Sequence, residues 1–324
     1  MKKLFIKISK LLGFEIIDQN KFLSPTLDKN LNEDLSIINE KSIILPLGEV
    51  KITRKVSSIL IIVRMNTELE IWDQSKKRLF EQPKLEYTIR SINSLIYSIN
   101  YCKNKFPNLK IKTLIIDDNS NKKNLSQIQK LIDNYDIEII PLNHKKFDTK
   151  IKKQKTLETF ANLASLLQSF EIGKEIGDDL IFFVEDDYLH LESMLEEMVS
   201  TYERIASQIG KDIFMCPSDY PYLYMNNEKT NIVIGNKRHW RTINKTLCSF
   251  LTSKYLINKY WDNFYKNCLD RHDPFEKYLN QIYEKEICIS PLKSLSIHMT
   301  NINSSYGLSP FINYKSLWDE NDYK

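Results

Sequence analysis

The chain has 324 residues, of which 42% are hydrophobic and 27% are charged, as in an ordinary soluble globular protein with a substantial core. The formal net charge of +4 is small for this length and gives no reason to expect nucleic acid as a partner, because that would call for a strongly basic face. Five scattered cysteines, none in a Cys-x-x-Cys pair, favour reduced thiols over a disulfide framework or a zinc site.

Residues 1–55 are predicted to form an N-terminal extension. Apolar residues recur at helical spacing near its start, and lysines lie elsewhere on the helical wheel. A helix docked on the main domain is the favoured interpretation; a helix in which residues 1–16 contact an anionic membrane is the alternative. No apolar run reaches the roughly 18 residues of a membrane span, so the protein is expected to be cytoplasmic, with a place at the inner face of the membrane left open. Residues 18–42 are polar and predict a loop-rich linker.

The main domain is predicted over 56–300, and its first half alternates strands with helices. Buried β-branched runs predict the strands, and apolar residues on one face predict the helices. This alternation is typical of parallel βαβ units, whose ligands bind beyond the carboxyl ends of the strands. The expected strands are 58–63, 113–116, 137–140 and 180–184, and the expected helices are about 87–99, 124–133, 156–170 and 191–208.

The second half has shorter elements and is interpreted as the acceptor-facing part of the same domain. A tail at 301–324 is expected to pack near the active site. The lysine-rich stretch 145–155 of the first half is interpreted as a solvated lead into a helix. The expected strands of the second half are 213–216, 231–234, 247–252 and 287–297, with a helix over 274–284.

Two of the predicted strands end in carboxylates. One runs into Asp117, Asp118, Asn119 and Ser120, and the other into Glu185-Asp186-Asp187. Crowded carboxylates repel one another and lose hydration, which is costly without a cation or hydrogen-bond donors. A hard divalent ion such as Mg²⁺ or Mn²⁺ would supply the cation and leave positions open for phosphate oxygens. The first run alone is also a common turn sequence.

The positions of the glycines exclude two phosphate-binding motifs from the first half of the chain. None of the seven glycines lies between Gly48 and Gly173. A phosphate-binding P-loop or a Gly-x-Gly-x-x-Gly turn requires clustered glycines, so neither exists in the first half of the chain. Any nucleotide must therefore be bound through side chains, a metal, or both.

The order of these features resembles that of inverting glycosyltransferases of the GT-A fold, especially family 2. The resemblance implies an α/β, Rossmann-like fold for nucleotide-diphospho-sugar transfer, with a mostly parallel central sheet. It implies that Asp118 contacts the nucleoside, that Asp187 is the main metal ligand, and that Asp186 or Glu185 supports the ribose or the metal ligands. The implied donor-binding residues are Arg64, Asp117, Asp118, Ser120, Glu185 and Asp186.

The resemblance continues downstream. Leu247–Leu256 is similar to the family segment that enters a helix after the acceptor loop. Asp273 takes the place of the family's general base, with Glu276 as the alternative, although Asp273 precedes Pro274 and could equally cap a helix. His298 follows the last predicted strand, where many members place a metal-binding histidine; a structural histidine is the other interpretation.

Acceptor binding is predicted for two loops rich in aromatic and basic residues, 217–224 and 237–241. Aromatic rings stack on sugars, and basic groups neutralise diphosphates or acidic acceptors. The candidates are Asp219, Trp240 and Arg241. The alternative is that these aromatics only cover the sheet.

The sequence thus predicts a metal-dependent glycosyltransferase. It would move a sugar from a nucleoside diphosphate sugar, with UDP-sugars favoured, to a glycan, lipid-linked or small-molecule acceptor, in one inverting displacement. Mn²⁺ or Mg²⁺ is the expected cofactor. A catalytically silent sugar- or nucleotide-binding scaffold is one alternative. A sugar nucleotidyltransferase is another, although such enzymes normally carry a glycine-rich loop where this chain has Asn66-Thr67-Glu68.

Overall fold

The structure is a computed structural model, and it describes residues 2–14, 27, 35–45, 47–68, 78–225, 229–299 and 305–323. Its helices are α1 (Lys2–Leu11), α2 (Lys84–Lys105), α3 (Lys122–Ile132), α4 (His144–Phe147), α5 (Leu157–Ile176), α6 (Met194–Ile209), η2 (Pro221–Tyr224), α7 (Lys254–Lys259), α8 (Trp261–Cys268), α9 (Lys277–Tyr283) and α10 (Tyr314–Glu320). Its strands are β1 (Lys41–Ile44), β2 (Gly48–Lys51), β3 (Ser58–Met65), β4 (Lys110–Asp117), β5 (Ile137–Pro141), β6 (Leu180–Glu185), β7 (Tyr188–His190), β8 (Phe214–Met215), β9 (Ile232–Ile234), β10 (His239–Thr242), β11 (Phe250–Ser253), β12 (Cys288–Pro291) and β13 (Ser296–His298).

A nine-stranded sheet in the order β5-β4-β3-β6-β11-β8-β12-β10-β9 forms the centre of the protein. The strands β5, β4, β3 and β6 are parallel to one another, which confirms the predicted βαβ alternation. The short strands of the second half continue this sheet through antiparallel pairs and one parallel pair, β8 with β12. The expected α/β class is therefore confirmed.

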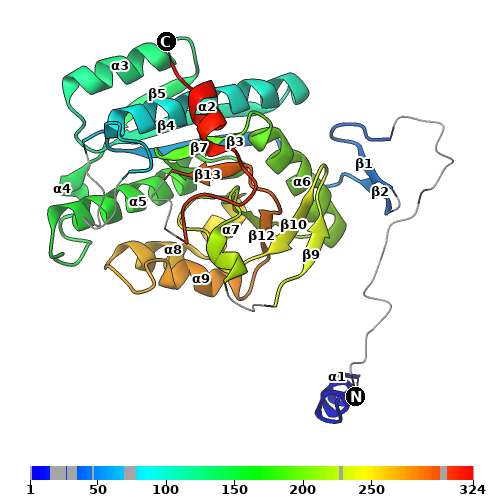
Figure 1. Ribbon diagram of the computed structural model, residues 1–324. Helices are drawn as coiled ribbons and strands as arrows, with labels where there is room; N and C mark the ends of the chain where they lie inside the picture. The colour runs from blue at the N-terminus through cyan, green and yellow to red at the C-terminus, as the bar shows by residue number, and fades with distance from the viewer. Residues whose placement is uncertain are drawn as a thin grey trace.

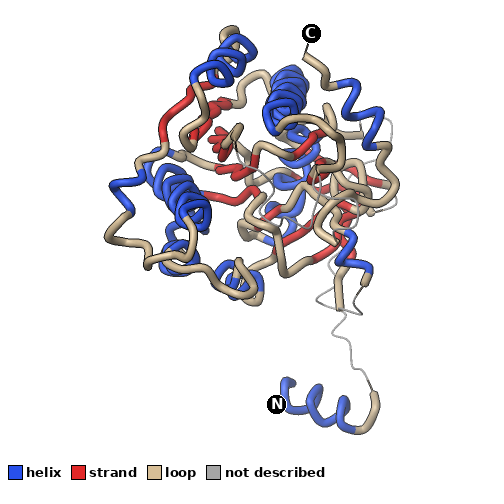
Figure 2. The backbone as a smooth tube through the Cα atoms, turned by 60° about the vertical axis from the view of Figure 1, so that its left-hand side comes forward, coloured by secondary structure: helices blue, strands red, loops and turns tan. Residues whose placement is uncertain are grey.

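Helices cover both faces of the sheet, as Figures 1 and 2 show. Helix α2 packs with α3 and α6 on one face, and α5 packs with α7 and α8 on the other. Strand β3 is buried along almost its whole length because both of its faces are covered. Polar caps begin several of the helices: at α3, for example, Asn121 accepts a hydrogen bond from the Asn124 amide, and at α5 Thr156 accepts one from the Thr159 amide.

Several elements differ from the sequence predictions. The loop expected at 237–241 contains strand β10, which lies between β9 and β12 and pairs antiparallel with both. The final strand expected over 287–297 is two strands in two sheets, because β13 leaves the main sheet to pair with β7. Part of the extension, 41–51, forms the hairpin β1-β2, which packs against α6. Most of the predicted linker, 18–42, lies outside the described residues.

Helix α1 does not dock on the main domain, contrary to the favoured interpretation. Its apolar side chains are open to solvent, with Leu4 63% and Leu11 82% exposed. In both views α1 stands apart from the sheet and its helices (Figures 1 and 2). Among the helices that the structure describes, none combines the length and hydropathy needed to cross a bilayer.

Candidate functional site

The carboxyl ends of three parallel strands meet at one edge of the sheet. Strand β3 lies between β4 and β6, with Arg64 opposite Glu185 and Met65 opposite Asp117. Side chains that are far apart in the sequence are therefore neighbours, and Arg64 forms an ion pair with Glu185. The predicted clustering of both acidic strand ends is what this register produces.

Asp117 and Ser120 hold the turn after β4. Asp117 accepts a hydrogen bond from the Ser120 amide at 3.2 Å, and the Ser120 hydroxyl accepts one from the Thr67 amide at 3.1 Å. Asp117 is buried, and burial raises the pKa of its carboxyl group. Asn119 adopts a left-handed backbone with φ 57°, which lets the chain reverse after Asp118. These contacts give Asp117 and Ser120 a positioning role in the turn.

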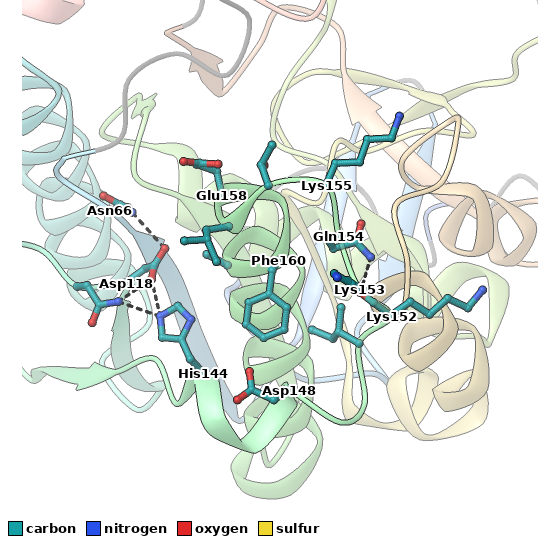
Figure 3. A pocket seen from close by; sticks show the side chains of 15 residues that line it. Asn66, Asp118, His144, Asp148, Lys152, Lys153, Gln154, Lys155, Glu158 and Phe160 are labelled. Atoms are coloured by element: carbon teal, nitrogen blue, oxygen red, sulfur yellow. Dashed lines mark hydrogen bonds and ion pairs between the residues drawn. The ribbon is translucent and has the colours of Figure 1, made fainter.

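Asp118 faces a pocket with a volume of about 900 Å³ (Figure 3). It pairs with the His144 imidazole at 2.8 Å and accepts a hydrogen bond from the Asn66 side chain at 3.1 Å. The ring of Phe160 lies roughly parallel to that of His144, with centroids 6.1 Å apart. Polar groups therefore lie at one end of the pocket and an aromatic face beside them. Sequence reasoning did not find His144 or Phe160, because neither lies at a strand end.

Residues 152–157 form another wall of this pocket. As expected, lysines of the stretch 145–155 are exposed and it leads into α5, and it also lines the pocket. Lys152 and Gln154 both contact the Asp270 carboxylate, at 3.0 and 3.2 Å. The Lys152 amide also donates to the Leu269 carbonyl at 2.9 Å. The pocket wall is thus tied to the loop that carries Asp273.

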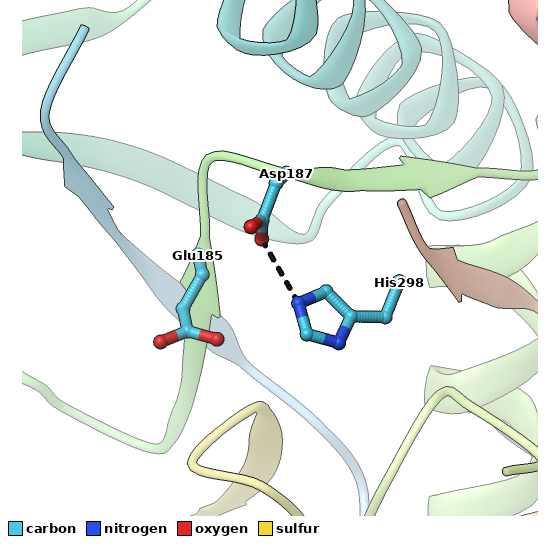
Figure 4. Close-up of side chains that lie close together, drawn as sticks. All are labelled: Glu185, Asp187 and His298. Carbon is cyan, nitrogen blue, oxygen red and sulfur yellow. Dashed lines mark ion pairs between the residues drawn. The ribbon is translucent and has the colours of Figure 1, made fainter. Parts of the chain in front are cut away.

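Glu185 at the end of β6, Asp187 just after it and His298 at the end of β13 form a compact group (Figure 4). One ligand atom from each lies within 4.8 Å of the others, as a shared metal ion would require. Asp187 Oδ1 is buried without a hydrogen-bond partner and lies 3.4 Å from His298 Nε2. His298 Nδ1 lies 3.0 Å from the Tyr306 carbonyl, which leaves Nε2 directed at the carboxylates. Two carboxylates and one imidazole are a donor set that suits Mn²⁺.

Each acid of this motif also has a basic neighbour within the chain. Besides the Arg64–Glu185 pair, the Lys84 ammonium lies 2.7 Å from Asp186 and 3.7 Å from Asp187. Burial raises the pKa of Glu185, and Arg64 opposes that rise. Burial acts in the same direction on Asp187, but Lys84 and His298 outweigh it and lower the pKa of that carboxyl group. Burial would lower the pKa of His298, but Asp187 raises it.

The two candidates for the general base occupy different surroundings. Asp273 is exposed in the loop before α9. Glu276 is only 4% exposed, and its carboxylate accepts hydrogen bonds from the Thr246 hydroxyl and the Cys248 amide. Leu247 and Cys248 both have positive φ, so Glu276 stabilises a strained turn. Asp273 does not cap α9, because Glu276 is the residue at that position.

The three acceptor candidates lie inside the protein. Trp240 is 0% exposed and offers no ring face to a sugar in this conformation. Asp219 is also 0% exposed and forms an ion pair with buried Arg241, while the Tyr224 hydroxyl donates to the same carboxylate. These two charges therefore pair with each other inside the protein. Trp240 is a buried residue of strand β10, which is nearer to the alternative interpretation of aromatics that pack on the sheet.

No protein-family model matches the chain, and no curated protein matches it. Several solved structures are similar. A crystal structure of S. aureus TarS, residues 1–349, is 9% identical with a TM-score of 0.44, and the match covers 74% of this chain and 59% of that one. The galactosyltransferase LgtC with donor and acceptor sugar analogues is 12% identical with a TM-score of 0.36, covering 69% and 70%.

A UDP-glucose pyrophosphorylase complexed with UDP-glucose is 10% identical with a TM-score of 0.38, covering 75% of this chain and 93% of that one. The matches therefore include glycosyltransferases and one nucleotidyltransferase. The chain spans 59% of the TarS fragment, and these distant likenesses assign it no residue and no substrate.

Proposed function

We propose that the protein is a glycosyltransferase of GT-A type that uses a nucleoside diphosphate sugar as its donor. The observation that carries this proposal is the meeting of β3, β4 and β6 at one edge of the sheet. Asn66, just after β3, lines a pocket with polar and aromatic walls. Its backbone amide donates to Asp186, which lies in the sequence between the two carboxylates of the cluster that His298 completes. A nucleoside diphosphate needs both parts of such a site. Its base and ribose require a pocket with polar and apolar groups, and its phosphates require a neighbouring positive charge.

The pocket would take the nucleoside. Asp118 would accept a hydrogen bond from the base or the ribose, and Asn66 and His144 hold the carboxylate in place for that contact. Phe160 would offer an apolar face to the ligand. Lys153 and Lys155, exposed on the wall, would attract the negative charge of the diphosphate. UDP-sugars are the first donors to test.

Glu185, Asp187 and His298 would hold a divalent ion, with Mn²⁺ the first candidate because two of the three ligands are carboxylates. When bound, the ion would neutralise charge that develops on the diphosphate leaving group. Arg64 holds the Glu185 carboxylate in register, and the Tyr306 carbonyl orients the His298 ring. These contacts prearrange the ligands, which limits the reorganisation that binding requires.

Asp273 is the favoured general base for an inverting displacement. It is exposed and lies on the loop that is tied to the pocket wall through Asp270. A base must reach the acceptor hydroxyl, and an exposed carboxylate is available for that contact. Glu276 is less suited, because hydrogen bonds within the turn already occupy its carboxylate. The acceptor is proposed to be a glycan, a lipid-linked sugar or a small molecule.

A nucleotide panel tests this proposal. Thermal stability would be measured with UDP-, GDP-, dTDP- and CMP-sugars, each with Mn²⁺ and with EDTA. A ligand at 100 times its Kd should add about 2.7 kcal/mol of stability. A shift with one nucleotide class that requires Mn²⁺ is the expected result, and the Asp118→Asn variant should lose it. No shift with any sugar nucleotide would favour a silent scaffold.

The reaction products distinguish a nucleotidyltransferase from a glycosyltransferase. That reaction would release pyrophosphate from a nucleoside triphosphate and a sugar 1-phosphate, whereas a glycosyltransferase releases the nucleoside diphosphate. The loop after β3 contains Asn66, Thr67 and Glu68 and no glycine, which disfavours the first reaction. Pyrophosphate release from UTP and glucose 1-phosphate would overturn the proposal.

We also propose that α1 lies on an anionic membrane surface. The helix presents exposed apolar side chains, and its sequence contains four lysines and no acidic residue. A helix of this composition places apolar side chains among the acyl chains and attracts anionic headgroups through lysine. The enzyme would then work at the inner face of the membrane, within reach of a lipid-linked acceptor.

A further inference from the structure

Lys84, the first residue of α2, carries a buried ammonium group within the acidic motif. Its side chain is 9% exposed, and Nζ lies 2.7 Å from Asp186 Oδ1 and 3.7 Å from Asp187 Oδ2. A buried lysine is costly unless carboxylates compensate it, so this placement indicates a specific pairing. Nothing in the sequence pattern marks Lys84, which is separated from the acids by most of two βαβ units.

Asp186 has partners for both of its carboxylate oxygens. Oδ1 accepts the hydrogen bond from Lys84, and Oδ2 accepts one from the Thr88 hydroxyl at 2.8 Å and one from the Asn66 amide at 3.2 Å. The residue is 6% exposed. Its carboxylate therefore joins the start of α2 to the end of β3, and both of its oxygens already have partners.

Asp187 is paired far less completely. Among the residues that the structure describes, its Oδ2 has only the longer contact with Lys84, and its Oδ1 has no hydrogen-bond partner. In the neighbouring Glu185 carboxylate, Oε1 pairs with Arg64. The ammonium thus faces the acids from one side, and the unsatisfied oxygen of Asp187 lies on the side of His298.

We propose that Lys84 is the built-in counter-cation of the acidic motif: it neutralises Asp186, partly offsets Asp187, and thereby weakens the hold of the Glu185–Asp187–His298 group on a divalent ion. The inference rests on the proposed metal site. It assigns Lys84 a positioning and tuning role, without contact to substrate. A site tuned in this way keeps its shape when no ion is bound, and it releases the ion together with the diphosphate product more readily than an uncompensated site would.

The test uses the full chain and the variants Lys84→Met and Lys84→Arg. Methionine has a similar length without charge, and arginine keeps the charge. Free Mn²⁺ would be measured by electron paramagnetic resonance during titration. Removal of one positive charge about 4 Å from a ligand should tighten Mn²⁺ binding about tenfold in Lys84→Met, because the attraction between the carboxylates and the ion is then unopposed. Lys84→Arg should bind Mn²⁺ as the wild type does.

A second measurement follows the melting temperature in EDTA. Lys84→Met should have a lower melting temperature than the wild type. Addition of Mn²⁺ should raise the melting temperature of Lys84→Met by more than it raises that of Lys84→Arg. The double variant Lys84→Met/Asp186→Asn should melt above Lys84→Met, because it no longer buries an uncompensated carboxylate. If Lys84→Met alone does not fold, the inference still predicts that the double variant folds. A double variant that also fails to fold would overturn the inference.

The outcomes separate the two proposals. Mn²⁺ binding in Lys84→Met but not in the wild type would support the role of Lys84 and remove the metal from the proposed function of the natural chain. Equal binding in both, or weaker binding in Lys84→Met, would overturn the role of Lys84 and leave the proposed function intact. No binding in either would overturn the role of Lys84 and likewise remove the metal from the proposed function.

Discussion

The imidazole of His298 stacks on the ring of Tyr188, with centroids 4.7 Å apart and ring planes inclined by 7°. The two residues are opposite each other in the β7–β13 pair. Tyr188 is fully buried, and its hydroxyl lies 2.6 Å from that of Tyr220. A rigid ring thus fixes the plane of the imidazole beside Asp187. A stacked neighbour of this kind narrows the orientations that a histidine ligand explores.

Substitution Tyr188→Leu should weaken Mn²⁺ binding about tenfold, because His298 loses the surface that orients it. Tyr188→Phe is the matched control: it keeps the ring, loses only the hydroxyl contact with Tyr220, and should bind Mn²⁺ as the wild type does. Calorimetric titration of the metal measures both. Equal affinities for the leucine and phenylalanine variants would show that the stack does not orient the ligand.

Asp118→Ala should weaken nucleotide binding by about 10- to 100-fold, since a charged hydrogen-bond acceptor in the pocket is lost. His144 and Asn66 would then lack the carboxylate that they hold. Calorimetry with the nucleotide identified by the panel provides the measurement. Asp148→Asn, which changes another carboxylate of the same pocket, serves as the control and should have little effect. Comparable losses in both variants would indicate general electrostatics in place of a specific contact.

The acidic strand ends could be predicted from the sequence because the pattern that marks them lies within a few consecutive residues. A buried apolar strand followed directly by carboxylates is visible in 180–187, and the parallel pairing follows from the alternation of elements. Lys84 gave no such signal, since a lysine at the start of a helix is ordinary until its tertiary neighbours are known. Trp240 was misjudged because a strand covered by other elements and an aromatic surface loop have similar composition. The hairpin β1-β2 was missed because its strands are short.

The two base candidates should separate in a paired experiment. Asp273→Asn should lower turnover about 10²- to 10⁴-fold, as expected for loss of a general base, and leave the melting temperature unchanged because the side chain is exposed. Glu276→Gln should reduce the free energy of unfolding by about 1–3 kcal/mol, because its carboxylate stabilises the turn at Cys248. Turnover lost in Glu276→Gln with full stability would reverse the assignment.

The N-terminal helix should bind vesicles that contain phosphatidylglycerol and release them in 0.5 M salt, a concentration at which lysine–headgroup attraction is screened. The double variant Leu4→Ser/Phe5→Ser should bind at least about tenfold more weakly, because two apolar side chains no longer enter the bilayer. Phe311→Ser removes a comparably exposed aromatic residue outside α1 and should bind as the wild type does. Sedimentation with the vesicles measures all three. Equal binding by both variants would contradict the placement of α1.

Stability should fall with acid because of His190. Its side chain is 1% exposed, Nδ1 lies 2.7 Å from the Ser296 hydroxyl, and Nε2 has no partner. Burial lowers the pKa of His190 to about 3. The folded state therefore keeps a neutral imidazole while the unfolded chain takes up a proton below its pKa of about 6.5. The resulting stability is complete above pH 6.5 and is lost as the pH falls toward 3.

Between pH 7.5 and pH 5.0 this linkage should remove about 2 kcal/mol from the free energy of unfolding. His190→Gln, which has no proton to gain, should lack that portion of the pH dependence, whatever its stability at pH 7.5. His239→Gln changes an exposed histidine and should retain the wild-type slope. Urea unfolding at the two pH values gives the differences directly. A His190→Gln variant with the wild-type slope would mean that another group governs the acid sensitivity, since the buried imidazole would then be protonated in the folded state at little cost.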